Sequence, residues 1–198
     1  VNEVMERLKA YRVEGTVEKV SRTVKEVFAP MDSEQMYRVA LMDFGVKQNM
    51  IDCLCRRGCE VTAFPASTPA ETVLEGGFDG VMLSNGPGDP AENTEIIAEL
   101  RKLYDSTIPI FGVCMGHQLL ALATGAKTGR LAYGHRGGNH PVRDLEKERV
   151  FITSQNHGYM VLSDTVDPAV AEVSHINVND GTCEGLKYKR PNCFTTQF

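Results

Sequence analysis

Cys114 lies between two glycines, Gly112 and Gly116, each two positions away along the chain. The apolar run at 108–111 suits a buried strand, and residues 118–123 are strong helix formers. A nucleophile placed this way in a sharp strand-to-helix turn is typical of a nucleophile elbow, here with cysteine in place of serine. Glycines avoid clashes in so tight a turn, and a helix N-terminus favours the reactive thiolate. For this motif alone, a buried structural cysteine is the alternative.

A second candidate stretch is the loop Asn-Gly-Pro-Gly-Asp-Pro at residues 85–90. Its prolines stiffen the backbone and its glycines, Gly86 and Gly88, keep it open, which suits a pre-formed hydrogen-bonding pocket. Taken alone, the loop could equally be a surface turn. Both this loop and Cys114 follow apolar runs, and ligands of parallel sheets bind beyond the carboxyl ends of the strands. We therefore expect the two motifs to meet at one site.

The elements that must position these motifs alternate regularly from residue 37 onward. Apolar runs predict strands at 39–42, 60–64, 80–83 and 108–111. Helical patterns predict helices at 46–57, around 96–103, and from 69, where a capping box at 68–71 has proline at the first helical position. This rhythm predicts a parallel sheet covered by helices on both faces. Beyond residue 125, shorter runs predict strands at 150–153, 169–174, 184–188 and 193–197. We expect these to form a smaller mixed or antiparallel sheet.

Composition excludes several classes of function. The chain has 198 residues and a net charge of −5, and no basic cluster indicates a nucleic-acid partner. No apolar run approaches the roughly 20 residues of a membrane span, and no signal peptide is evident, so we expect a cytoplasmic protein without a membrane partner. The six cysteines contain no C-x-x-C pair, and reduced thiols are favoured over a zinc site at Cys53, Cys55 and Cys59.

The first 36 residues differ from the rest. Apolar residues at 4, 5, 8 and 11 predict a short amphipathic helix, followed by a charged segment that runs to residue 30. We interpret residues 1–36 as the end of a truncated N-terminal domain plus a linker, without a functional site, and residues 37–198 as the main domain. Both chain ends suggest a piece of a longer protein.

The stretches at 83–90 and 111–118 together resemble the class I, or triad-type, glutamine amidotransferases, and the resemblance runs from about residue 39 to 198. Within that family, residues 134–142 and 155–159 are similar to small subunits of glutamine-dependent carbamoyl phosphate synthases. The resemblance implies an α/β fold with a flavodoxin-like central parallel sheet, helices on both faces, and a smaller mixed or antiparallel sheet.

The same resemblance implies a reaction and partners. L-glutamine is hydrolysed to glutamate and ammonia, and the ammonia passes to a large subunit that makes carbamoyl phosphate from bicarbonate for arginine and pyrimidine synthesis. ATP and Mg belong to that large subunit, so no cofactor is expected in this chain. Other class I amidotransferases, a catalytically incomplete interaction module, and a free-standing cysteine hydrolase of γ-glutamyl compounds are the alternatives.

Individual roles carry over by position. Cys114 matches the nucleophile that forms a γ-glutamyl thioester, and the backbone N–H groups of Gly86 and Met115 match the oxyanion hole. The positions that match glutamine-binding residues are Gly86, Gly88, Met115, Gln118, Asn156, Gly158 and Tyr159. We assign no metal ligand.

The histidines near these motifs are not assigned as the base. We expect His117 to brace the fold, and His135 and His140 to lie in a glycine-rich turn with a structural or interface role. His157 is flanked by substrate-binding positions, yet the family takes its base from a His-Pro-Glu run after Gln-Phe. Here that run should begin after Phe198. We therefore expect the 198-residue fragment to be inactive as a glutaminase, or slowed by several orders of magnitude.

Overall fold

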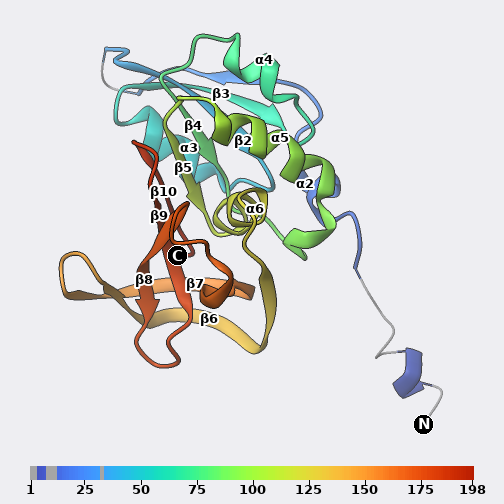
Figure 1. Cartoon of the computed structure of the whole chain (residues 1–198). Helices are drawn as coiled ribbons and strands as arrows, with labels where there is room; N and C mark the ends of the chain where they lie inside the picture. Colours follow the sequence, from blue (N-terminus) through green and yellow to red (C-terminus); the bar gives the residue numbers. More distant parts are fainter. Residues whose placement is uncertain (1–3, 8–12, 32–33) are drawn as a thin grey trace.

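The computed structural model describes residues 4–7, 13–31 and 34–198. Ten strands form one sheet in the order β1-β3-β2-β4-β5-β10-β9-β7-β6-β8 (Figure 1). The strands are β1 (Glu26–Phe28), β2 (Tyr37–Asp43), β3 (Cys59–Pro65), β4 (Gly80–Leu83), β5 (Ile110–Val113), β6 (Thr128–Asp144), β7 (Arg149–Val161), β8 (Ala171–Asn177), β9 (Cys183–Tyr188) and β10 (Cys193–Thr196). The helices are α2 (Thr16–Val20), α3 (Gln48–Cys55), α4 (Ala70–Leu74), α5 (Thr94–Asp105) and α6 (Met115–Ala123), with short 3-10 turns η1 (Pro90–Glu92) and η2 (Ser163–Thr165).

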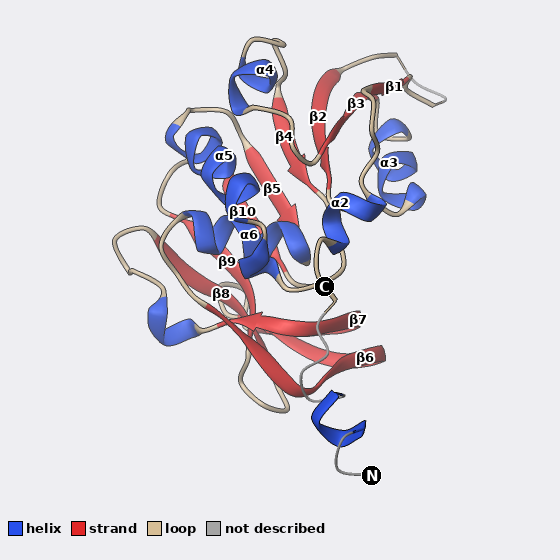
Figure 2. Ribbon diagram, turned by 90° about the vertical axis from the view of Figure 1, so that its right-hand side faces the viewer, coloured by secondary structure: helices blue, strands red, loops and turns tan. Residues whose placement is uncertain are grey.

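The central sheet is parallel, as its apolar runs predict. Strands β3, β2, β4, β5 and β10 pair in parallel, and β1 adds an antiparallel edge to β3. Helix α3 buries Ile51 and Cys55 in one hydrophobic cluster with β2 and β3, while α4, α5 and α6 share a second cluster with the other face (Figure 2). Because helices cover both faces of the sheet, the sequences of its central strands are continuous apolar runs. The predicted fold class is confirmed.

The second half of the chain closes on itself. Strands β9, β7, β6 and β8 follow one another in the sheet, and β8 also pairs with β9. The long hairpin of β6 and β7 was only partly predicted, and the placement of His135 and His140 in a glycine-rich turn is wrong, since both lie within β6. Register shifts between Arg130 and His135, and between Gly137 and His140, absorb the glycines. Such bulges hide the alternation on which strand prediction depends.

Helix boundaries differ from the predictions where caps were misassigned. Helix α4 begins at Ala70 with Pro69 as its N-cap and no side-chain cap, so the predicted capping box at 68–71 is wrong. The N–H of Ala70 instead donates to Glu99 Oε2 of helix α5 at 2.7 Å. A residue 29 positions away in sequence therefore satisfies one of the N–H groups left unpaired at the start of the helix.

The N-terminal segment packs against the sheet. Residues 4–7 are helical, and the remainder of the amphipathic helix predicted near the N-terminus lies outside the described residues. Val17 of α2 is fully buried in the core cluster that contains α6, and β1 joins the sheet. The boundary between residues 36 and 37 stays a prediction. No helix within the described ranges is both long and apolar enough to span a membrane.

Candidate active site

Cys114 occupies the sharp turn between β5 and α6. Its φ of 53° and ψ of −103° are unusual for a residue other than glycine. The N–H of Cys114 donates to the Thr196 carbonyl at 2.9 Å, and the N–H of Gly116 donates to the Ser84 carbonyl at 3.0 Å. These bonds hold a strained backbone between two neighbouring strands, as is common at functional sites.

The flanking glycines are required by packing. A Cβ atom at Gly116 would lie 2.4 Å from the Leu83 carbonyl oxygen, and one at Gly112 would lie 2.9 Å from Thr195 Cγ2. Any side chain would therefore push α6 away from β4, or β5 away from β10. This confirms the predicted reason for glycine on either side of the nucleophile.

The loop 84–90 is clamped from the side of β2. Ser84 Oγ accepts a hydrogen bond from the Phe44 N–H at 2.9 Å, and Asn85 Nδ2 donates to the Gly45 carbonyl at 2.9 Å. A Cβ atom at Gly86 would lie only 2.2 Å from the Phe44 carbonyl oxygen. The loop is thus a pre-formed wall, and it is more than a surface turn.

The two motifs meet at one cleft of about 650 Å³. Among the predicted site residues, those that line it with Cys114 are Gly86, Gly88, Gln118, Asn156, Gly158 and Tyr159. The side chain of Met115 is 1% exposed, so this residue can offer only its backbone N–H. The expectation that both loops lie at one edge of the sheet is confirmed.

Other lining residues were missed by the sequence reasoning. They are Val20, Gly45, Lys47, Met50, Arg136, Ser154, His157, Gln197 and Phe198, whereas Asn85, Pro87 and Val113 belong to the two predicted stretches. Val20 belongs to α2, so the expectation that residues 1–36 hold no part of a site is wrong. The Gln-Phe pair at 197–198 could have indicated that Gln197 lines the site. The sequence reasoning used this pair only to place the His-Pro-Glu run expected after Phe198.

The net electrostatic effect on the nucleophile is opposite to the one expected from the helix N-terminus. Burial raises the pKa of the Cys114 thiol above its ordinary value. The N–H groups of Met115 and Gly86 act in the opposite direction on this pKa, followed by the side chains of Gln197 and Lys47. The helix N-terminus therefore favours the thiolate as expected, but desolvation outweighs these donors and the net pKa of the thiol is raised. Their influence also indicates that both candidate oxyanion donors face the sulfur.

Gln118 is held in one orientation. Its Nε2 donates to the Tyr159 carbonyl at 2.8 Å and to Gln197 Oε1 at 2.8 Å. With both amide hydrogens used, only its Oε1 is free to accept from a ligand. Gln197 Nε2 is buried and has no hydrogen-bond partner within the described part of the chain. It is a donor available to a ligand beside Cys114.

No histidine in the described ranges forms a hydrogen bond with Cys114 Sγ. His117 is fully buried and its Nδ1 pairs with Thr195 Oγ1 at 2.7 Å. Burial, with a smaller effect of His157, lowers the pKa of His117 to about 3, so the ring is neutral at pH 7. His157 turns its Nδ1 to the Tyr159 carbonyl at 2.8 Å.

Comparison with protein families matches residues 40–198 to the family described as glutamine amidotransferase class-I. The carbamoyl phosphate synthase small chain of Clostridium perfringens is 46% identical over 198 residues, covering 100% of this chain and 54% of the relative. The one of Escherichia coli O6:H1 is 48% identical over 169 residues, covering 85% of this chain and 44% of the relative. The chain therefore spans about half the length of these curated relatives.

Solved structures agree on the fold. A putative GMP synthase subunit from Thermoplasma acidophilum superposes with a TM-score of 0.72 at 20% identity, covering 84% of this chain and 85% of that one. A glutamine amidotransferase from Thermotoga maritima gives a TM-score of 0.64 at 18% identity, covering 82% and 75% of the two chains. At such low sequence identities, these structural similarities indicate the fold alone.

Proposed function

Because the chain belongs to the class I glutamine amidotransferase family, we propose that it is the glutamine-hydrolysing part of a carbamoyl phosphate synthase small chain. The observation that carries this proposal is the position of Cys114 on the elbow, in the same cleft as Gly86 and with Met115 as the next residue, whose N–H groups both lower the pKa of its thiol. The subfamily follows from relatives that are 46% to 48% identical and carry that name.

In the proposed reaction, Cys114 Sγ attacks the side-chain amide carbon of L-glutamine. The carbonyl oxygen becomes an oxyanion that accepts hydrogen bonds from the N–H groups of Gly86 and Met115. Collapse of the tetrahedral intermediate expels the amide nitrogen, which takes up a proton and leaves as ammonia. Water then cleaves the γ-glutamyl thioester, which releases glutamate and restores the thiol.

Proton transfer in both steps needs a base with a pKa near the working pH. A raised pKa of Cys114 makes that need greater, because the thiol must lose its proton before it attacks. We propose that the base is the histidine of the family's His-Pro-Glu run, which follows a Gln-Phe pair such as Gln197 and Phe198.

Neutral groups around the cleft suit the amino-acid end of glutamine. Gln118 Oε1 is the free acceptor for the α-ammonium group, since its Nε2 is engaged by Tyr159 and Gln197. Gly88, Asn156, Gly158 and Tyr159 line the same cleft and belong to the proposed glutamine pocket.

The ammonia would pass to a large synthetase subunit, which would use ATP and Mg to form carbamoyl phosphate from bicarbonate. Arginine and pyrimidine synthesis would consume that product. We place this work in the cytoplasm and assign no nucleic-acid or membrane partner to the chain.

The test is glutamine hydrolysis by the 198-residue chain beside a version extended through a His-Pro-Glu run. The extended protein should hydrolyse glutamine, and Cys114→Ala should abolish this. Cys53→Ser, a change at another free cysteine, should leave it intact. With the large subunit present, Cys114→Ala should still support synthesis from ammonia. Loss of ammonia-dependent synthesis in a folded variant, or equal glutaminase rates with and without the extension, would contradict the proposed mechanism.

A further inference from the structure

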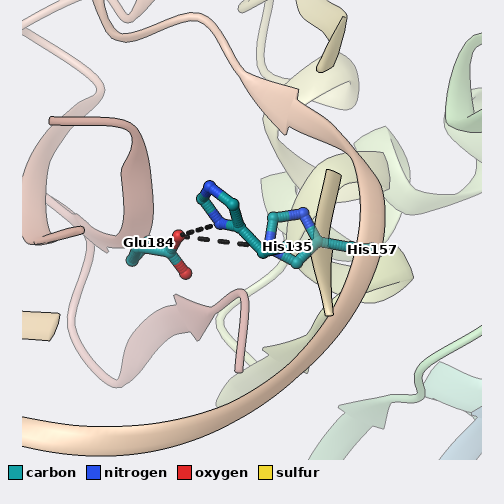
Figure 3. A group of neighbouring side chains, drawn as sticks. All are labelled: His135, His157 and Glu184. Atoms are coloured by element: carbon teal, nitrogen blue, oxygen red, sulfur yellow. Dashed lines mark hydrogen bonds and ion pairs between the residues drawn. The ribbon is translucent and has the colours of Figure 1, made fainter. Parts of the chain in front are cut away.

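Three buried side chains from three strands of the closed half point toward one another (Figure 3). They are His135 of β6, His157 of β7 and Glu184 of β9, and their nearest ligand atoms all lie within 4.8 Å of one another. His135 Nδ1 lies 3.2 Å from Glu184 Oε1, and His157 Nε2 lies 4.0 Å from the same oxygen. The exposed fractions are 7%, 6% and 0%, so water does not solvate the group freely.

A fourth donor atom lies among these three. Gln155 Oε1 is 2.9 Å from His135 Nδ1 and 3.0 Å from His157 Nε2. Its amide orientation is set by the Nε2 atom, which donates to Glu184 Oε2 at 3.0 Å and to Thr153 Oγ1 at 3.1 Å. Two oxygens and two ring nitrogens therefore converge on one point.

The outer nitrogen of each imidazole already has an acceptor. His135 Nε2 lies 2.8 Å from Asp180 Oδ2, and His157 Nδ1 lies 2.8 Å from the Tyr159 carbonyl oxygen. A neutral imidazole carries a single N–H. We assign that N–H to the outer nitrogen in both rings, which leaves the inner lone pairs facing the oxygens of Glu184 and Gln155. Lone pairs on facing acceptors repel unless a proton or a cation lies between them.

We propose that His135, His157 and Glu184, with Gln155 Oε1 as fourth donor, bind a divalent cation of the zinc class. Zinc bonds of about 2.0–2.2 Å in tetrahedral geometry place neighbouring ligand atoms about 3.3 Å apart. The four separations of 2.9, 3.0, 3.2 and 4.0 Å bracket that spacing, so small side-chain rotations close the site.

The surroundings match those of known metal sites. Histidine ligands usually donate their second N–H to a carboxylate or a backbone carbonyl, which are the roles of Asp180 and Tyr159 here. Asp180 has a side chain that is 42% exposed, so the cluster lies close to solvent on this side. A bound ion would tie β6, β7 and β9 together beside Tyr159, and its ligand His157 also lines the Cys114 cleft.

The test begins with the unmodified chain and cobalt(II) or zinc as the probe. One equivalent of cobalt should bind with the visible spectrum of a tetrahedral nitrogen and oxygen site. It should show no sulfur-to-cobalt charge-transfer band, and zinc should displace it. Absence of saturable binding, or a spectrum that reports only sulfur ligation by cysteines, would overturn the proposal.

Variants then locate the site. Asp180→Asn keeps all four donors and should weaken zinc binding by roughly 10- to 100-fold. Glu184→Gln removes a charged ligand and should weaken binding at least as much. Asp164→Asn, in the 3-10 turn η2, is the matched control and should bind as the unmodified chain does. Unchanged affinity in Asp180→Asn would overturn the proposal, and this variant and the cobalt spectrum decide the matter even if Glu184→Gln fails to fold.

Discussion

Thr16 Oγ1 donates a hydrogen bond to the Pro87 carbonyl oxygen at 3.0 Å, which fastens helix α2 to the loop that carries Gly86 and Gly88. A Cβ atom at Gly88 would lie 1.9 Å from Thr16 Oγ1, so the two segments are in direct contact. Val20, one turn further along α2, lines the cleft of Cys114. The N-terminal segment is therefore part of the wall of the site.

We expect Thr16→Val to loosen this wall. It keeps the side-chain shape but removes the donor, which should lower the free energy of unfolding by about 1 kcal/mol. It should also slow the alkylation of Cys114 by a glutamine-like electrophile several-fold. Thr23→Val, at an exposed threonine of the same segment, is the control. Urea unfolding and mass spectrometry measure the two effects, and equal behaviour of the two variants would show that the hydrogen bond does not support the loop.

Gly86→Ala should cut glutamine hydrolysis by roughly 10²–10³, the usual loss when one oxyanion donor is displaced. The reason is steric, because the new Cβ would meet the Phe44 carbonyl oxygen at 2.2 Å and shift the N–H. Gly138→Ala is the matched control, since no atom lies within 4 Å of a Cβ built there. The assay is steady-state turnover of the extended protein. A folded Gly86→Ala variant with full turnover would remove Gly86 from the oxyanion hole.

Cys114 should react slowly with iodoacetamide at neutral pH in the absence of glutamine. Burial raises the pKa of its thiol, so the thiolate fraction should increase only above the ordinary range of cysteine. Lys47→Gln should move the midpoint further upward, because the Lys47 charge lowers this pKa. The rate of alkylation measured against pH gives the midpoint. A midpoint below that of the urea-unfolded chain would contradict this expectation.

His117 should make the fold sensitive to acid. Its pKa is lowered to about 3 in the folded chain, whereas an unfolded histidine titrates near 6.5. Only the unfolded state takes up this proton between those values, so the stability contribution is complete above about pH 6.5. It is then lost at up to about 1.4 kcal/mol per pH unit as the pH falls toward 3.

His117→Gln tests this expectation, because it removes the titrating ring. Urea unfolding at pH 7 and pH 5 should show a smaller loss of stability in the variant than in the unmodified chain. An equal loss in the two proteins would mean that other groups account for the acid sensitivity.

The elbow and the alternation of strands and helices could be predicted from the residues in order. Gly112 and Gly116 encode a tight turn through local sterics, and the apolar runs from residue 39 to 111 encode buried strands through their composition. These signals involve residues that are close in the chain, so no knowledge of the fold is needed to interpret them. The strand β6 escaped prediction because its glycines and bulges interrupt the alternation.

The remaining features depend on residues far apart in the sequence. Thr16 meets Pro87 across 71 positions, and His135 meets Glu184 across 49. Whether burial or nearby N–H groups dominate the pKa of Cys114 also depends on how much protein surrounds the sulfur. The packing of whole helices and strands decides these pairings, because it determines which polar groups are buried and which of them meet a partner. Local sterics therefore encode the nucleophile and its turn, while long-range packing sets its environment, its N-terminal wall and the histidine cluster beside it.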